Sequence, residues 1–442
     1  MTLPPGPTTR MPGGLAFAVN RDLLGTFQGI ARTYGDVSMF KVGKFRVALL
    51  VHPDDVGRVL VSHQHDFVKG ETLAYLRRII GNGLLTSEGD FHLRQRRLIQ
   101  PIFHHSRLGT YGQLMVERAE RTAARWRPGE RVDASAEMVR AMLGNAAKAL
   151  LDTEVEDESS GVGRWVNQVL TMANRAINPL APVLDALPLP SNFRFRTAKR
   201  HLDELVFAII GEHRSTQAET NDLLARLMAA RDDGDHGQGM TDAQIRDEVM
   251  TLFLAGYETV ASALTWTWFL LAQNPSVEAR LHAELDEVLG ERAPTVEDLP
   301  DLVYTRQVAS ESLRLCPPVP ALNRQAVVDV EAGGYEIPTG TIVVLSPYVT
   351  QRDARFFHDP TRFDPDRWKD EWSPTPRLAF FPFGGGARMC VGESFAWMEL
   401  ILVLATLASR WRLVLEPGTR VEPRVRVTLR PKGGLPMRVL KR

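Results

Sequence analysis

The alternation of apolar and polar positions predicts helices over most of the first two thirds of the chain. An amphipathic helix is expected near residues 22–34, and residues 53–286 follow a mainly helical pattern. Within that stretch, residues 244–272 are predicted to form one long helix. Asn274 and Pro275 predict the start of the next helix, with Asn as its cap and Pro at the first helical position.

Short strands are expected in three places. Residues 36–51 are typical of a hairpin, residues 326–346 contain two predicted strands joined by a Pro-Thr-Gly turn at 338–340, and residues 411–440 indicate a few more. Residues 395–408 differ from their surroundings because they are apolar on all sides, as in a buried helix.

These elements predict a mainly α fold with a small β-rich part. Residues 1–29 are expected to form an N-terminal arm and a first helix. Residues 30–442 are expected to form a single domain, because no linker in the sequence is long enough to divide them.

The charge and hydropathy of the chain argue against some classes of partner. Its 442 residues include 53 Lys and Arg and 53 Asp and Glu, so the formal net charge is zero. This balance argues against bulk attraction to nucleic acid or to an anionic membrane. The longest apolar run lies within residues 260–272 and is too short to span a bilayer, and no signal peptide is visible. We therefore expect a cytoplasmic protein without a membrane anchor.

The sequence contains two cysteines, Cys316 and Cys390, too few for a disulfide framework or a four-cysteine metal site. Cys390 comes shortly after three successive glycines and before the apolar helix. Glycines let the backbone approach a flat group closely, and a helix N-terminus favours a thiolate. The segment therefore indicates an axial haem ligand, and the alternative is an inert cysteine in a Gly-rich turn.

The segment resembles a known signature. Phe383-x-x-Gly386-x-x-x-Cys390-x-Gly392, with Arg388 two residues before the cysteine, is similar to the haem-binding signature of the cytochrome P450 superfamily. The resemblance implies that Cys390 ligates the iron of haem b and that Phe383, Arg388 and Gly392 help to bind the cofactor. It also implies a fold in which helices enclose the haem.

Three residues match the structural network of that family. Glu311 and Arg314 lie three positions apart on a predicted helix, and Arg367 follows in a Phe-Asp-Pro-Asp-Arg-Trp segment. Taken alone, the pair is a surface salt bridge worth a few tenths of a kcal/mol. The resemblance implies instead a buried triad whose loss would leave a charge unpaired.

Residues 255–259 resemble the oxygen-binding helix motif of the same family. Ala255 and Gly256 would leave room for the cofactor, Thr259 would guide protons to dioxygen, and Glu258 would help to relay them. A Thr hydroxyl can also bond back to the carbonyl four residues earlier and loosen the helix. Most relatives have a second Thr or Ser next, whereas this chain has Val260, which puts in doubt how proton delivery is shared.

The haem propionates need cations or hydrogen-bond donors. His92 and Arg96 lie four positions apart, on one face of a predicted helix. Together with Arg324 and Arg388 they resemble the propionate-binding residues of the family. For each of these residues alone, the simpler interpretation is a solvated cation.

The predicted substrate pocket is apolar, and its candidate residues are Leu84, Leu85, Phe253, Leu254, Val319, Ala321 and Leu322. An apolar lining favours a hydrocarbon-like substrate over a sugar or nucleotide. The chain is similar to bacterial terpene-oxidising members, with a fatty acid, polyketide or steroid as the other possible substrates.

The resemblance implies a monooxygenase that uses O2 and two electrons. No flavin or ferredoxin domain is fused within this sequence, so a separate ferredoxin and ferredoxin reductase are expected. Two alternatives stay open. One is a peroxide-dependent haem-thiolate enzyme, against which the Ala255–Thr259 motif argues, and the other is a non-enzymatic haem sensor or carrier.

Overall fold

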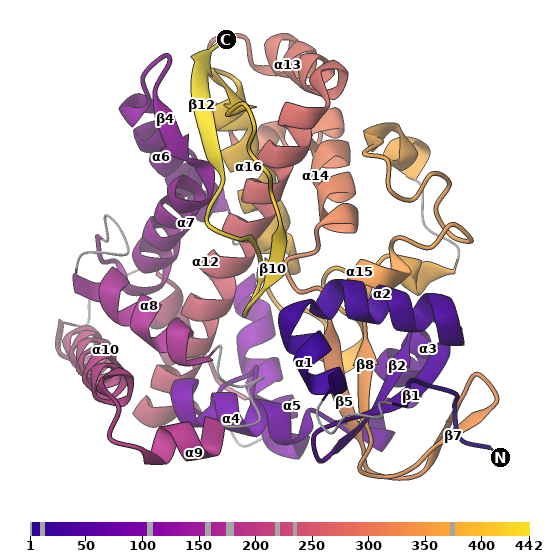
Figure 1. Ribbon diagram of the computed structural model, residues 1–442. Coiled ribbons are helices and arrows are strands. Elements are labelled where there is room, and N and C mark those ends of the chain that lie inside the picture. Colours follow the sequence, from indigo (N-terminus) through magenta and orange to yellow (C-terminus); the bar gives the residue numbers. More distant parts are fainter. Residues whose placement is uncertain are drawn as a thin grey trace. The chain divides into compact units, whose positions relative to one another are not determined.

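The structure, a computed structural model, is mainly helical with small sheets, which confirms the predicted fold class (Figure 1). It describes residues 2–8, 14–103, 109–154, 161–173, 181–216, 222–232, 237–371 and 376–442. The chain forms two compact units. The first, here the sheet unit, comprises residues 1–71, 307–390 and 422–430, and the second, the helical unit, comprises residues 72–306, 391–421 and 431–442. The single domain expected over residues 30–442 stays a prediction.

The sheet unit is built on a five-stranded sheet with the strand order β1-β2-β8-β5-β3. The β2–β8 pair is parallel and the other pairs are antiparallel. The elements of this unit are α1 (Gly14–Arg21), α2 (Leu23–Tyr34), α3 (Pro53–Gly57), α15 (Pro347–Thr350), β1 (Val37–Val42), β2 (Phe45–Leu50), β3 (Phe67–Val68), β5 (Leu322–Ala326), β6 (Val330–Ala332), β7 (Tyr335–Ile337), β8 (Ile342–Leu345) and β10 (Pro423–Val425).

Alternate residues of β2 enter two different cores. Leu49 packs with Phe27 of α2 on one face of the sheet. Leu50 packs on the other face, in a core that also contains Phe381. Side chains alternate between the two faces of a strand, so both faces of this sheet are covered. Phe381 thereby fixes the start of the segment that leads to Cys390.

The prediction of two strands in residues 326–346 is wrong, because this range contains β6, β7 and β8 and the end of β5. Gly333 and Gly334 have φ of +55° and +81° and turn β6 into β7. The Pro-Thr-Gly turn does not join a hairpin, since β7 pairs with β6 whereas β8 pairs with β2 and β5. Each of these strands is only three residues long, Val-Glu-Ala and Tyr-Glu-Ile, and such a short alternation of apolar and polar residues did not stand out in the sequence. The hairpin expected at residues 36–51 is confirmed as β1 and β2.

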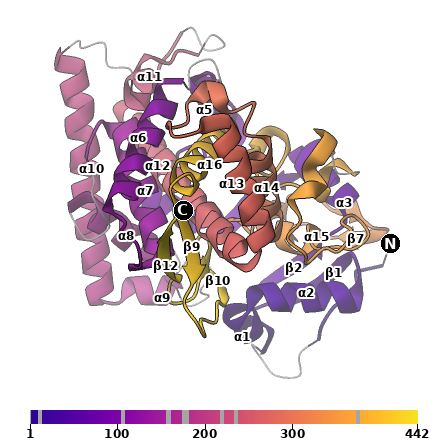
Figure 2. The ribbon, with the colours of Figure 1, turned by 90° about the horizontal axis from the view of Figure 1, so that it is seen from above.

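The helical unit contains the long helix α12, with α7, α8 and α10 on the same side of it in both views (Figure 1, Figure 2). Helices α4 (Gly70–Ile80) and α14 (Val303–Leu315) and strand β11 (Leu429–Pro431) include residues of both units. The other elements of the helical unit are α5 (Gly89–Ile99), α6 (Gly109–Arg125), α7 (Ala134–Leu151), α8 (Gly161–Ala173), α9 (Ala181–Ala186), α10 (Pro190–Thr216), α11 (Leu223–Ala229), α12 (Asp242–Gln273), α13 (Pro275–Leu289), α16 (Glu393–Ala408), β4 (Arg131–Asp133), β9 (Trp411–Leu415) and β12 (Pro436–Lys441).

The boundaries of α12 and α13 follow from their end residues. A capping box starts α12, because Thr241 Oγ1 accepts from Gln244 N at 3.3 Å and Thr241 N donates to Gln244 Oε1 at 2.9 Å. Pro275 starts α13, as predicted. The expected cap by the Asn274 side chain is wrong, since its amide donates instead to Leu270 O at the end of α12, at 2.8 Å.

Helix α16 confirms the prediction of a buried helix after the cysteine. Every residue from Met398 to Ala408 is buried. Apolar residues on all sides leave no solvent-facing stripe, which suits a helix packed within a core. Among the described residues, no helix combines the length and the apolar character that crossing a membrane requires.

Candidate functional site

The segment before Cys390 packs closely against Leu60 and Gln64 of the same sheet unit. Gly386 has a φ of +66°, and a Cβ at this position would lie 1.8 Å from Leu60 O. Neither the backbone conformation nor the space allows a larger residue there. Ala387 N donates to Gln64 Oε1 at 2.9 Å, which fastens the same turn from the side. Gly386, one of the three successive glycines that the sequence singled out, therefore serves the packing of the loop.

Cys390 lies at the end of this fastened turn. Its backbone N donates to Phe383 O at 3.0 Å, so the cysteine and the aromatic residue of the signature are held together. Cys390 is exposed, whereas Cys316 is buried and its pKa is raised to about 11 by burial. An exposed sulfur can bind a ligand, and a buried thiol with a raised pKa is inert. The apolar helix α16 begins three residues later, at Glu393, after Gly392.

Two predicted cations belong to the sheet unit. Arg388 ends the short helical turn Gly386–Arg388 and is half-buried. Arg324 lies on β5, is half-buried, and donates from Nη1 to Asn323 O at 2.8 Å.

Two other predicted residues lie on α5 in the helical unit. His92 is buried and Arg96 is half-buried, one helical turn further on. Residues four apart share one face of a helix, so the structure keeps these two side chains on the same face, as expected.

Helix α12 is buried along most of its length but has one open face. Ala255 is exposed, and Gly256 and Thr259 are half-buried. A Cβ at Gly256 would meet no atom within 4 Å. Thr259 Oγ1 donates to Ala255 O at 2.8 Å and lies 3.3 Å from Gly256 O. The back-bond expected from the sequence is therefore present, at the point where the helix is open. Glu258 is buried beside this face.

Glu311 is the centre of a buried network in the sheet unit. Its carboxylate accepts from Arg314 Nε and Nη2, both at 2.8 Å, and from Arg367 Nε at 3.4 Å. It also accepts from Asp364 N at 3.0 Å and from Trp368 Nε1 at 2.9 Å. The structure thus brings the three predicted members together and adds two donors that the sequence analysis did not include.

The Arg314 guanidinium also donates to three backbone carbonyls. These are Gln351 O at 2.8 Å, Pro360 O at 2.7 Å and Arg362 O at 3.0 Å. Arg314 is fully buried, as is its partner Glu311. A buried ion pair is stable only when its remaining donors and acceptors are satisfied, and this network meets that condition. Glu311 and Arg314 therefore do not form the surface salt bridge that their spacing alone suggests.

The predicted pocket residues of the helical unit differ in their exposure to solvent. Leu85 is exposed, whereas Leu84, Phe253 and Leu254 are buried. Leu252 is half-buried on the same stripe of α12 as Ala255 and Thr259, and the sequence analysis did not single it out. Residues 249–257 of α12 are nearly all apolar, so this stretch gives no periodic signal for its open face, and Leu252 could not be found from the pattern.

The predicted pocket residues of the sheet unit are half-buried. These are Val319, Ala321 and Leu322, which precede or begin β5. Leu322 packs against the core that contains Phe381, and Ala321 packs against the core of the other sheet face.

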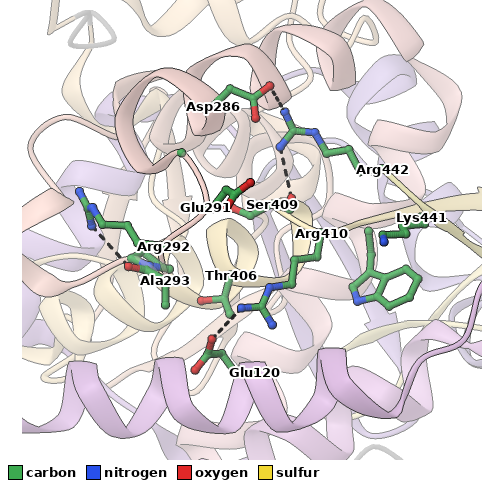
Figure 3. A pocket seen from close by; sticks show the side chains of 13 residues that line it. Glu120, Asp286, Glu291, Arg292, Ala293, Thr406, Ser409, Arg410, Lys441 and Arg442 are labelled. Carbon is green, nitrogen blue, oxygen red and sulfur yellow. Dashed lines mark hydrogen bonds and ion pairs between the residues drawn. The ribbon is translucent and has the colours of Figure 1, made fainter.

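A hollow of about 660 Å³ in the helical unit differs from the expected apolar site (Figure 3). Arg410 pairs with Glu120 at 3.0 Å, and Arg442 pairs with Asp286. Charged groups that already neutralise one another offer little to a hydrocarbon.

The residues present fit a haem held by a thiolate. The sheet unit supplies an exposed cysteine on a fastened glycine turn, with two half-buried arginines. The helical unit supplies a helix face without a side chain at Gly256. Within the residues that the structure describes, no group of three or more His, Cys, Asp or Glu could hold a metal ion. A single exposed cysteine suits an axial haem ligand.

Comparisons with known proteins agree with this assignment. The family model described as Cytochrome P450 matches residues 4–436. The chain is 40% identical over 429 residues to cyclooctatin synthase of Streptomyces melanosporofaciens, covering 95% of this chain and 93% of that protein. It is 38% identical over 399 residues to pentalenene oxygenase of Streptomyces avermitilis, covering 90% and 88%.

One solved structure shows the same fold. The crystal structure of the cytochrome P450DA heme domain has a TM-score of 0.90 to this chain, at 24% identity, and the match covers 100% of this chain and 98% of that one.

Proposed function

The chain belongs to the cytochrome P450 family, and from this premise we propose that it oxidises a terpene-like hydrocarbon. Membership makes it a haem-dependent monooxygenase that uses O2 and electrons from redox partners. Relatives at 37% to 40% identity are named cyclooctatin synthase, cyclooctat-9-en-7-ol 5-monooxygenase and pentalenene oxygenase. These names support a terpene-like substrate over a fatty acid, polyketide or steroid.

The observation that carries the proposal is the open face of α12. Leu252 and Ala255 present aliphatic groups there, and Thr259 presents a hydroxyl that is already bonded to the helix. A face with one polar group among aliphatic ones suits an apolar molecule that is to be oxidised at one position.

The residues of this chain would hold the cofactor through its iron and its propionates. Cys390 would bind the iron, with Phe383 and Gly392 beside it, and His92, Arg96, Arg324 and Arg388 would bind the propionates. A thiolate-ligated haem supplies oxygen activation by pushing electron density toward O–O cleavage. We propose haem b, because covalent attachment of c-type haem uses a Cys-x-x-Cys-His sequence, and neither Cys316 nor Cys390 belongs to one.

Thr259 and Glu258 are proposed to handle protons. The Thr259 hydroxyl holds its proton against Ala255 O. When this bond is released, the same hydroxyl can donate into the open face and accept from a neighbouring water. Glu258, the preceding residue, would supply replacement protons. Ala255 and Gly256 contribute by leaving the space beside Thr259 free.

We propose that a separate ferredoxin and ferredoxin reductase deliver the two electrons. The family model takes up residues 4–436 of these 442, so the haem-protein family accounts for nearly all of the given sequence. A cytoplasmic location remains a prediction from the sequence.

Two spectroscopic measurements test the proposed function. The reduced, CO-bound spectrum should show the red-shifted Soret band of a thiolate-ligated haem, and Cys390→Ala should lose it. Titration with sesquiterpene and diterpene hydrocarbons should shift the Soret band of the resting protein, whereas fatty acids of similar length should not. Shifts with fatty acids alone would contradict the proposed substrate class and leave the monooxygenase assignment in place.

A further inference from the structure

Residues 81–87, which join α4 to α5, lie flat against α12. We call this segment the latch loop. A Cβ at Gly83 would come within 2.3 Å of Thr251 Oγ1 and 2.7 Å of Asp247 O, and a Cβ at Gly81 would come within 2.0 Å of Asp247 Oδ1. Two glycines are therefore required for the loop to lie this close to the helix.

Two successive carboxyl groups of α12 bind the backbone of the latch loop. Asp247 Oδ2 accepts from Asn82 N at 2.7 Å, and Glu248 Oε2 accepts from Leu84 N at 2.8 Å. Asp247 is itself held by Arg246, whose Nη1 donates to Oδ1 at 2.8 Å and to Ile80 O at 3.1 Å. These contacts fix the position of the loop relative to the helix.

The latch loop is also held together internally. Thr86 Oγ1 donates to Gly81 O at 2.7 Å, and Ser87 N donates to Gly83 O at 2.9 Å. Arg77 of α4 donates to Thr86 O. The loop is therefore braced internally, and its hydrogen bonds to Asp247 and Glu248 join it to α12.

Glu248 lies on the open stripe of α12. Positions 248, 252, 255 and 259 follow the spacing of one helix face, so Glu248 shares its face with Ala255 and Thr259. Seven residues of helix separate Glu248 from Ala255, a rise of about 10 Å. The loop that Glu248 holds also carries Leu85, whose side chain is 36% exposed.

A buried glutamate destabilises the fold, so it is an unusual residue for a purely structural contact. Glu248 has no exposed surface, and its second oxygen, Oε1, has no hydrogen-bond partner. Burial raises the pKa of Glu248 to about 8, and the charge of Asp247 beside it adds to this effect. A buried polar atom without a partner lowers stability, so the contact is weaker than a fully satisfied one and can be released more easily.

We propose that Glu248 is a positioning residue for substrate binding, which holds the latch loop on the open face of α12 so that Leu85 bounds the space for the substrate. The inference rests on the proposed function, because it takes the open face as the place where an apolar molecule lies. The helical rise from Glu248 to Thr259 is about 16 Å, which excludes direct contact of Glu248 with the reacting atoms.

Hydrogen exchange on the haem-loaded protein tests the contact directly. In Glu248→Ala, the amides of Asn82 and Leu84 should exchange faster, for Leu84 by about tenfold, the equivalent of one lost hydrogen bond. Glu248→Gln keeps an acceptor and should stay close to wild type. Wild-type exchange in Glu248→Ala would overturn the proposal.

Two iron-binding probes of different size test the substrate role. Imidazole needs little room, whereas 4-phenylimidazole extends into the space beside the iron. In Glu248→Ala the dissociation constant of 4-phenylimidazole should rise by about tenfold, as for one lost hydrogen bond, while that of imidazole stays the same. A faster-exchanging loop with unchanged binding of both probes would make Glu248 merely structural and would overturn the inference.

A glycine pair gives a matched control that leaves Glu248 intact. Gly83→Ala pushes the loop away from Thr251 and should reproduce the effects of Glu248→Ala. Gly211→Ala makes the same change on α10, where a Cβ meets no atom within 4 Å, and should behave as wild type. If Glu248→Ala does not fold, Gly83→Ala tests the role of the loop position, and loss of the pH dependence of Leu84 exchange in Glu248→Gln tests the role of the carboxyl group. A wild-type protein that binds neither probe and lacks the CO band would instead remove the proposed function.

Discussion

The hydroxyl of Thr259 donates to the carbonyl oxygen of Ala255 at 2.8 Å, within the same turn of α12. Ala255 is exposed, so this hydrogen bond lies at the open face of an otherwise buried helix. A carbonyl that accepts a side-chain bond loosens its hold on the helix ladder, and the hydroxyl has an alternative partner whenever water or ligand reaches that face.

Replacement of Thr259 should separate oxygen consumption from substrate oxidation. Thr259→Ala removes the hydroxyl, and the product formed per electron consumed should fall by about tenfold or more, with the remainder appearing as peroxide. Thr259→Ser retains the hydroxyl and should keep most of the wild-type yield. Measurement of product, peroxide and NAD(P)H in a reconstituted system checks this, and equal yields for the Ala and Ser variants would show that the hydroxyl has no role.

The two cysteines should respond in opposite ways to the same substitution. Cys390→Ala removes the exposed sulfur and should abolish the red-shifted band of the reduced, CO-bound protein. Cys316→Ala removes a buried thiol that contributes packing, so the band should remain. A thiolate-type band that persists in Cys390→Ala would place the iron ligand elsewhere.

Loss of Glu311 should destabilise the protein strongly. Glu311→Ala leaves the buried Arg314 guanidinium without its carboxylate, which should lower the free energy of unfolding by about 3 to 5 kcal/mol. Lys369 pairs with Asp366 at 3.0 Å on the surface, and Lys369→Ala should change stability by about 0.5 kcal/mol or less. Chemical denaturation of both variants tests the contrast, and similar losses would contradict it.

The hold of Glu248 on the latch loop should weaken as pH rises. Its pKa is raised from 4.5 to about 8 where it is buried, so the bound position takes up a proton that the released position gives up. Between about pH 4.5 and 8 the equilibrium should therefore shift toward release, by up to about tenfold per pH unit, and it should be constant above that range.

The neighbouring charges do not reverse this direction. Asp247 raises the pKa of Glu248 further, Arg246 is engaged by Asp203 and Asp247, and Arg77 binds the Thr86 carbonyl. Exchange of the Leu84 amide, corrected for its intrinsic pH dependence, measures the shift. Glu248→Gln should abolish the pH dependence, and a pH-independent wild type would contradict the prediction.

Much of the candidate site was predictable because its chemistry restricts residue type at short spacing. Cys390 and Phe383 belong to one turn, and Glu311 and Arg314 to one turn of α14, so their order in the sequence already implies proximity. The same holds for Thr259 and Ala255, because a back-bond joins positions four apart. In each case the two residues are only a few positions apart, so their contact can be predicted from their spacing in the sequence.

The latch loop could not be found in this way. Leu84 and Glu248 are separated by 164 positions, and the donor is a backbone N–H, which any residue but proline provides. Nothing in the identity of Leu84 indicates such a partner. Phe253 and Leu254 show a related difficulty, since an apolar residue within a helical stretch that is apolar on all sides does not reveal which way it faces.

The bare stretch of α12 around Ala255 and Gly256 bears on how this protein can diverge. A side chain added at Gly256 enters room that no protein atom occupies within 4 Å, so it need not disturb the folded core. At the buried positions of the helix, an added methyl group would have to displace packed neighbours. A substitution at Gly256 can therefore leave the folded protein intact and still disturb the cofactor for which this face leaves room, so function rather than stability limits which residues this position accepts.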